Sequence, residues 1–234
     1  YNVAYWFWEL PNFPEPWRYA CHLVDEVWVN TEFVANAVRQ VHGRVYKIPF
    51  AIEFDTPNAR FNRQYFGLPD TGFIFLFSYD FNSSSARKNP KAVIEAFSCA
   101  FPDRNTRIRL VVKTINGEQN PEALKCLKAS LDDDPRIFFV EGYLTTEEMR
   151  GLLNTADAYV SLHRSEGLGL GMAESMYLGK PVIGTAYSGN MEFMNIENAC
   201  LVKFRLIPVA DGDYPYHSGQ VWAEPDITEA AAWL

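Results

Sequence analysis

The 234-residue sequence predicts an α/β protein in which a mostly parallel sheet carries helices on both faces. Two observations lead to this fold class. Short apolar runs alternate along the chain with segments of helical period, which is the order that parallel sheets require. The run FIFLFSY at residues 73–79 is apolar except for Ser78, as is typical of a strand that is buried on both faces.

The strand and helix patterns fall into two stretches, residues 1–52 and 71–234. Residues 53–70 hold Pro57 and Pro69 and have no sustained period, so we interpret them as a linker. In the first stretch Thr31 is expected to cap a helix. The elements predicted there are strands at 3–10, 26–30 and 45–48 and helices at 17–24 and 32–41.

The second stretch begins with the apolar strand at 73–79. Thr145 and Thr146 precede acidic residues and are expected to cap a helix. The further strands predicted are 108–113, 137–140, 158–162 and 181–185, and the helices are 90–101, 121–131, 147–156 and 170–178.

Composition excludes several classes of protein. The net charge of −8 argues against a nucleic-acid-binding protein, which needs a basic face. The four cysteines form no CxxC pair and are expected to be buried, reduced thiols, in keeping with a cytosolic setting. No apolar run reaches about 18 residues. We therefore expect a cytoplasmic protein, with peripheral attachment to the inner face of the membrane as an alternative.

The segment AYVSLHRSEGLGLGMAESMYLGKPVIGT carries the most chemical information. A strand runs into a turn with Gly167, Gly169 and Gly171, and a helix then begins. The free N–H groups of a helix N-terminus suit a diphosphate. Glu166 before the helix and Glu174 within it can each hold a diol, one on a sugar and the other on a ribose. The alternative is an ordinary strand–turn–helix with two surface glutamates.

A second segment, FSYDFNSSSARKNPKAVIEAF, places two cations between a strand and a helix. Arg87 and Lys88 can neutralise a diphosphate leaving group there, or they form an ordinary cationic turn. Lys113, at a strand end, is a candidate for the phosphates. His163, just before the glycine turn, is a candidate donor contact, although a single histidine is more often structural.

These motifs resemble a known family. EGLGLGMAE is similar to the E-x7-E signature of the retaining group 1 glycosyltransferases (glycosyltransferase family 4), and MYLGKPVIGT resembles its continuation. The Arg87–Lys88 segment resembles the family's diphosphate motif. Relatives place the arginine several residues before the lysine, so the roles of the two adjacent cations here are left open. In relatives, the loop that corresponds to Tyr143 and Leu144 lies beside the nucleotide base.

The resemblance implies a GT-B fold, in which two Rossmann-like domains face each other across the active site. Residues 71–234 would be the nucleotide-sugar-binding domain and residues 1–52 the end of the acceptor-side domain, so we expect a fragment that lacks most of the latter. This chain alone is expected to bind the donor but to transfer sugar very slowly or not at all. Glu9 would line the cleft, or it is a surface residue before a proline turn.

The implied reaction transfers a sugar, with retention of configuration, from a nucleoside-diphosphate sugar of UDP or GDP type to an acceptor hydroxyl. The acceptor would be a carbohydrate or a lipid-linked molecule, in polysaccharide or glycoconjugate synthesis. The catalytic residues would be Glu166, Arg87 and Lys88. The donor-binding residues would be Glu174, Gly167, Leu168, Gly169, Leu170, His163, Lys113, Tyr143 and Leu144.

No metal or other cofactor is expected. The strings Asp132-Asp133-Asp134 and Asp211-Gly212-Asp213 are interpreted as solvated loops. Two alternatives remain: a non-catalytic nucleotide-sugar-binding fragment, and another GT-B enzyme such as a sugar-nucleotide epimerase or a phosphorylase, although no motif for a pyridoxal-phosphate lysine is found. Self-association is also expected, through apolar surface at Tyr5, Trp6, Phe7 and Trp8.

Overall fold

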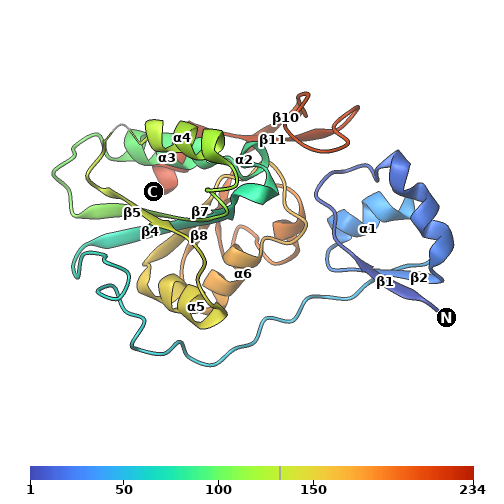
Figure 1. Cartoon of the computed structure of the whole chain (residues 1–234), viewed down its shortest axis with the longest axis horizontal. Coiled ribbons are helices and arrows are strands. Elements are labelled where there is room, and N and C mark those ends of the chain that lie inside the picture. Colours follow the sequence, from blue (N-terminus) through green and yellow to red (C-terminus); the bar gives the residue numbers. More distant parts are fainter. Residues whose placement is uncertain (132) are drawn as a thin grey trace.

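The computed structural model describes residues 1–131 and 133–234 and shows two units joined by a long connecting segment, residues 48–72 (Figure 1). The larger unit is built on a six-stranded parallel sheet, and the smaller, N-terminal unit on a three-stranded parallel sheet. The predicted α/β class is confirmed.

The larger sheet has its strands in the order β6-β5-β4-β7-β8-β9, and every neighbouring pair is parallel. The chain order reverses between β4 and β7. Ligands of open α/β sheets bind at such a switch point, outside the carboxyl ends of the strands. The strands are β4 (Phe73–Asp80), β5 (Ile108–Ile115), β6 (Ile137–Glu141), β7 (Ala158–Ser161), β8 (Val182–Thr185) and β9 (Cys200–Val202).

Side chains of β4 alternate between two apolar layers, which explains its continuously apolar sequence. Phe75 and Phe77 face the layer formed with α3 (Pro90–Ala100), α4 (Pro121–Ala129) and α7 (Ile227–Trp233). Ile74 and Leu76 face the layer formed with α5 (Thr146–Thr155) and α6 (Leu170–Tyr177). Figure 1 shows the helices on both sides of the sheet. Helices therefore cover both faces of the sheet, and a ligand can reach it only at the ends of the strands.

The predicted helix caps are present. Thr31 accepts a hydrogen bond from Val34 N at the start of α1 (Glu32–Arg39), and Thr145 forms a capping box with Glu148 at the start of α5. The sequence did not predict α2 (Ser85–Lys88), β9, β10 (Phe204–Pro208), β11 (Val221–Pro225) or the short 3₁₀ turns η2 (Phe81–Ser83) and η3 (Gly189–Glu192).

The smaller unit differs from its prediction in two elements. β1 (Val3–Trp6) ends four residues earlier than the strand predicted at 3–10. The helix predicted at 17–24 is a 3₁₀ helix, η1 (Glu15–Leu23). η1 has a proline in its first turn, which favours a helix start, but no side-chain cap. β1 pairs with β2 (Glu26–Val29), which pairs with β3 (Val45–Lys47).

One face of the three-stranded sheet packs on α1, and the other face is open. Val3, Tyr5, Trp28 and Tyr46 lie on the open face and are 37–47% exposed. Trp8 was expected at the surface and is 4% exposed, because it packs in the apolar core of the smaller unit. Of the other three residues expected at the surface, Tyr5 and Phe7 are exposed and Trp6 is half-buried.

A β-hairpin from late in the chain joins the two units. β10 (Phe204–Pro208) pairs antiparallel with β11 (Val221–Pro225). Trp222 of β11, which is 1% exposed, and Val209 belong to the apolar core of the smaller unit together with Trp8. Figure 1 shows the hairpin extending from the larger unit towards the smaller one, so the smaller unit's core is completed by residues from the far end of the chain.

Two cysteines were placed wrongly. Cys21 is buried, whereas Cys99 and Cys126 are exposed, because each lies on the solvent side of its helix. The longest helix among the described residues is α3, with 11 residues, and none is long and apolar enough to cross a bilayer.

The connecting segment packs against α5 at one glycine, and this gives a test of the fold. A Cβ on Gly151 would lie 2.3 Å from Phe61 Cβ, and Phe61 is 4% exposed. We expect Gly151→Ala to overpack this contact at a cost of about 1–3 kcal/mol and to lower the Tm by roughly 5 °C. Gly43→Ala, which adds a methyl group in open space, is the matched control. Equal melting of the two variants would show that the segment does not pack there.

Candidate functional site

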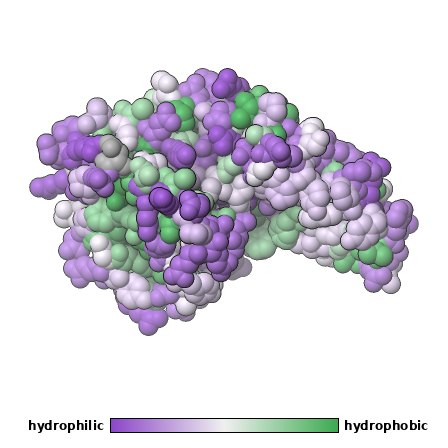
Figure 2. All heavy atoms as spheres, turned by 45° about the horizontal axis from the view of Figure 1, so that its top comes forward, coloured by the Kyte–Doolittle hydropathy of each residue, from purple (hydrophilic) through white to green (hydrophobic). Residues whose placement is uncertain are grey.

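A cavity of about 530 Å³ lies at the carboxyl ends of β4, β5 and β7. This volume is in the range of small-molecule sites. Glu9 and Phe7 of the smaller unit and Phe50 of the connecting segment complete its wall. Hydrophobic side chains reach the surface in the recess where the two units meet (Figure 2). Besides Glu9 and Phe7, the residues singled out from the sequence that line the cavity are Lys88, Lys113, Tyr143, Leu144, Glu166, Gly167, Leu168, Gly169, Leu170 and Gly171.

The backbone of the glycine turn, residues 166–171, is contacted from both units. Gly189 N donates to Glu166 O at 2.8 Å, and a Cβ on Gly189 would lie 2.1 Å from Gly167 O. On the other side, Thr31 Oγ1 donates to Gly167 O at 2.9 Å. Gly169, with φ +91°, then starts α6 in a conformation that favours glycine. The turn therefore holds the N-terminus of α6 at the cavity.

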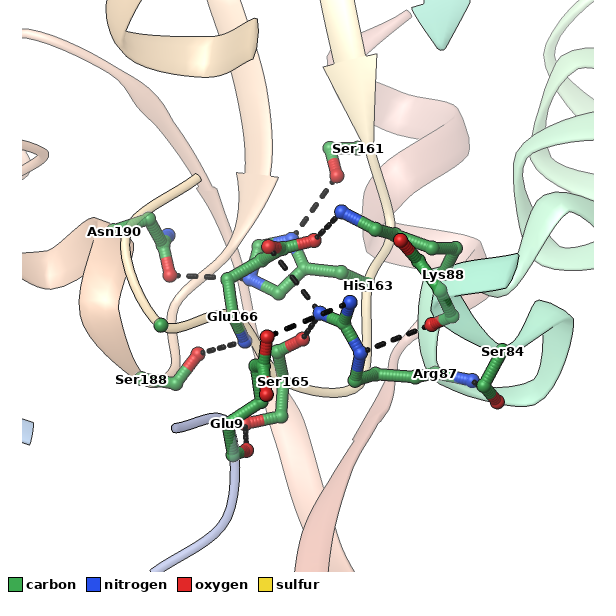
Figure 3. Close-up of polar contacts among 12 residues, drawn as sticks. Glu9, Ser84, Arg87, Lys88, Ser161, His163, Ser165, Glu166, Ser188 and Asn190 are labelled. Carbon is green, nitrogen blue, oxygen red and sulfur yellow. Dashed lines mark hydrogen bonds and ion pairs between the residues drawn. The ribbon is translucent and has the colours of Figure 1, made fainter. Parts of the chain in front are cut away.

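Glu166 lies at the cavity wall as a buried, doubly paired carboxylate (Figure 3). Its Oε1 accepts a hydrogen bond from Lys88 Nζ, and its Oε2 lies 3.3 Å from Arg87 Nη1. Burial alone would raise the pKa of Glu166, but Lys88 and Arg87 outweigh it and lower the pKa to about 2. The side chain is thus ionised and able to accept hydrogen bonds from a polyhydroxylated ligand.

The structure separates the two adjacent cations. Lys88 lines the cavity, whereas Arg87 is 4% exposed and is not among the described residues that line it. The Arg87 guanidinium donates to Ser83 O and Ser165 O at 3.2 and 2.9 Å, and its Nη2 lies 3.9 Å from Glu9 Oε1. Most of its donors are used within the protein, so Arg87 is placed to position Glu166 and the backbone around it.

His163 is fully buried behind the cavity and does not line it. Its Nδ1 lies 3.1 Å from Ser161 Oγ, and its Nε2 lies 3.1 Å from Asn190 Oδ1. The Asn190 amide donates to Thr185 O, which turns its oxygen towards the histidine. Burial lowers the pKa of His163. A neutral ring with its hydrogen on Nε2 satisfies every partner, so His163 connects β7 to η3 as a structural residue.

The far end of the cavity is formed by β5 and by the loop after β6. Lys113 Nζ donates to Thr114 O at 2.8 Å and to Gly142 O. Tyr143, which is 83% exposed, and Leu144 follow directly and line the same end. Together they present a cation and an apolar wall.

Glu174 lies one turn into α6 and is not among the described residues that line the cavity. Its Oε1 lies 3.9 Å from Arg150 Nε of α5, and Arg150 lies over the ring of Phe54 in the connecting segment. Burial raises the pKa of Glu174, and Arg150 opposes the rise. The Glu174 carboxylate is thus close to the cavity but forms an ion pair with Arg150.

Glu9 was left open from the sequence and lies in the cavity wall. Its Oε2 accepts a hydrogen bond from Tyr214 Oη at 2.6 Å, and its backbone oxygen accepts one from Ser165 Oγ. Sequence reasoning missed Tyr214 and also Ser78, Asp80 and Ser161, which line the cavity or support it. The position of the last three at strand ends was a usable signal.

Two described aspartates of these strings pair with basic side chains. Asp134 forms an ion pair with Arg136 at 2.6 Å, and Asp211 lies 3.2 Å from His217 Nε2. Asp132 lies outside the described residues. In the part of the chain that the structure describes, no group of three or more His, Cys, Asp or Glu residues is placed to hold a metal ion.

Comparison with known proteins gives a family and a fold. Residues 58–204 match the family model described as "Glycosyl transferases group 1". No curated protein matches the chain.

Solved glycosyltransferase structures share the fold. HepE of Anabaena, crystallised with UDP and glucose, superposes with a TM-score of 0.65 at 20% identity over 86% of this chain. A glycosyltransferase of Rickettsia africae gives 0.66 at 17% identity over 86%. The pneumococcal O-GlcNAc transferase GtfA, in complex with UDP and GlcNAc, gives 0.59 at 15% identity over 99%. The aligned part is 57%, 56% and 44% of those chains, respectively, so this chain spans about half their length.

The low pKa of Glu166 predicts a pH effect on stability. Because the folded-state pKa of about 2 is below the ordinary 4.5, the ionised group stabilises the fold above pH 4.5, and this contribution is lost as the pH falls towards 2. Between pH 6 and 3.5 the free energy of unfolding should fall by roughly 1 kcal/mol more in the wild type than in Glu166→Gln.

Urea unfolding at a series of pH values measures this difference. Glu197→Gln, at an exposed glutamate, is the control and should follow the wild type. Parallel curves for the wild type and Glu166→Gln would contradict the paired, ionised state.

Proposed function

Because the chain belongs to the group 1 glycosyltransferases, we propose that it transfers a sugar from a nucleoside-diphosphate sugar to an acceptor hydroxyl with retention of configuration. One observation carries the proposal. The cavity at the switch point combines the start of α6 with the buried pair of Glu166 and Lys88. A helix N-terminus and a cation suit a diphosphate, and a fixed carboxylate suits sugar hydroxyls.

Each part of the donor has a chemical counterpart in the cavity. The diphosphate lies at the first turn of α6, where backbone N–H groups have no partner within the helix. Lys88 faces the diphosphate and Glu166 binds sugar hydroxyls. Glu174 binds the ribose diol once it exchanges its contact with Arg150 for the ligand. Tyr143 and Leu144 lie beside the base.

In the proposed step the bond between the anomeric carbon and the diphosphate oxygen breaks. The acceptor oxygen bonds to the same carbon from the same side, and its proton leaves with the diphosphate. The charge that develops on the leaving oxygen is stabilised by Lys88 and the α6 N-terminus, which are fixed before the reaction. Arg87 acts indirectly, because it holds Glu166 and Ser165 in place.

Donor type and acceptor follow from chemistry and from the relatives. HepE and GtfA were crystallised with UDP, which favours a UDP-sugar donor here, with a GDP-sugar as the alternative. We propose that a carbohydrate or lipid-linked hydroxyl accepts the sugar, in polysaccharide or glycoconjugate synthesis. Since protein cations and a helix terminus neutralise the diphosphate, we propose that donor binding needs no metal, and EDTA should leave it unchanged.

Nucleotide binding to Glu174→Gln tests the donor site. A carboxylate that accepts hydrogen bonds from a diol contributes about 1.5–3 kcal/mol, so this variant should bind UDP or GDP about tenfold or more weakly than the wild type in calorimetry. Glu197→Gln is the matched control. Unchanged affinity of Glu174→Gln for free UDP, GDP and ADP would show that Glu174 does not bind the ribose.

A transfer assay with UDP- and GDP-sugars then separates an enzyme from a binding module. Product whose anomeric configuration, read by NMR, matches that of the donor supports the retaining reaction. Inverted product contradicts it, and binding without any transfer supports the module.

The open face of the three-stranded sheet predicts self-association. It carries Val3, Tyr5, Trp28 and Tyr46 as a contiguous apolar row on three neighbouring strands, and we propose that a second copy of the chain covers it. Light scattering after gel filtration should show dimers of the wild type and monomers of Tyr46→Lys. Tyr19→Lys, at an exposed tyrosine of η1, should behave as the wild type. A monomeric wild type would contradict the proposal.

A further inference from the structure

Lys113 is a buried cation without an anionic partner. It is 3% exposed, and its two hydrogen bonds go to the backbone oxygens of Thr114 and Gly142. Among the described residues no carboxylate forms an ion pair with it, whereas Lys88, in the same cavity, is paired with Glu166. Burial lowers the pKa of Lys113 to about 8. An unpaired buried ammonium is costly, which indicates that a ligand completes its surroundings.

The position of Lys113 selects the part of the ligand that it meets. It lies on β5, and Glu166 follows β7, two strands away in the sheet order. With neighbouring strands about 4.8 Å apart, the two residues are separated by about 10 Å along the edge of the sheet. If the sugar and diphosphate occupy the Glu166 end, the other end of a nucleoside diphosphate reaches Lys113.

The surroundings of Lys113 fit a planar, apolar ring better than a second phosphate. The neighbouring loop brings the ring of Tyr143 and the side chain of Leu144 to the cavity. Aromatic side chains stack on nucleobases. The α6 N-terminus, which suits phosphate, belongs to the Glu166 end of the cavity.

The hydrogen-bond count of Lys113 leaves one donor for the ligand. An ammonium carries three N–H donors, and two of them are used by Thr114 O and Gly142 O. A carbonyl oxygen on the base can accept the third. Uracil and guanine carry such oxygens. Adenine carries none, because its exocyclic group is an amino donor and its acceptors are ring nitrogens.

We propose that Lys113 selects the nucleobase of the donor, so that the site takes uracil or guanine nucleotides in preference to adenine nucleotides. The inference rests on the proposed function and adds a specificity-determining residue to it.

Calorimetry of UDP, GDP and ADP with the wild type and Lys113→Met tests the proposal. The wild type should prefer UDP or GDP to ADP. Lys113→Met should bind the preferred nucleotide about tenfold or more weakly and bind ADP unchanged, because only the carbonyl contact is lost. Lys113→Gln keeps an N–H donor without the charge and should restore part of the preference.

Lys180→Met is the matched control. Lys180 also donates to a backbone oxygen, that of Asn154, at 2.8 Å, and it lies outside the cavity, so all three affinities should stay at the wild-type values. Thermal melting checks that each variant is folded.

The other outcomes overturn the inference in distinguishable ways. Equal weakening of all three nucleotides by Lys113→Met would place Lys113 at the phosphates, as the sequence first indicated. No weakening would leave it without a role in binding. If none of the three nucleotides binds to the wild type, the proposed function itself fails, and the choice of base fails with it.

Discussion

The site depends on one close approach of backbone to backbone. Gly189 packs against Gly167 so closely that a Cβ has no room, and Thr31 of the smaller unit donates to the same Gly167 oxygen. Any side chain larger than hydrogen at Gly189 would push the backbone of η3 away from the glycine turn. The glycine turn is therefore fixed from two sides, and it fixes in turn the carboxylate of Glu166 and the start of α6. A preorganised site of this kind needs little rearrangement when charge develops in a reaction.

The charges around the turn are arranged in two layers. Lys88 and Glu166 face the cavity, and Arg87 lies behind them, with its donors used by Ser83, Ser165 and Glu166. Removing one partner of such a buried ion pair leaves the other charge without compensation. His163, neutral and fully buried, belongs to the same supporting layer. Lys88 and Glu166 thus face the cavity, and the layer behind them determines their orientation.

The sequence predicts the core of the larger unit well because that core is made of local patterns. β4, β5, β7 and α5 lie within a few residues of their predicted positions, since continuous apolar runs and a capping box mark them. β10 is mostly exposed and gains its partner only through β11, so neither strand has a strong local signal. Local pattern cannot show a structure that depends on pairing between distant residues.

Some features of the candidate site also follow from local patterns, and others depend on contacts between distant residues. The gathering of Glu166, Lys88 and the glycine turn follows from the rule that parallel strands end at one edge of the sheet. The separation of Arg87 from Lys88 does not follow, because it depends on which neighbour turns into the core. Contacts such as Tyr214 with Glu9, 205 positions apart, arise only when the two units meet.

The hairpin of β10 and β11 makes the order of the chain a poor guide to where it can be cut. Trp222 belongs by sequence to the larger unit, yet its indole is part of the same apolar core as Trp8 and Leu10 of the smaller unit. Expressing residues 1–52 alone would leave a gap in that apolar core. Expressing residues 71–234 alone would expose Trp222 to solvent. For dissection or domain exchange, each side of this molecule consists of two noncontiguous segments, because α7, which follows the hairpin, packs back into the core of the larger unit.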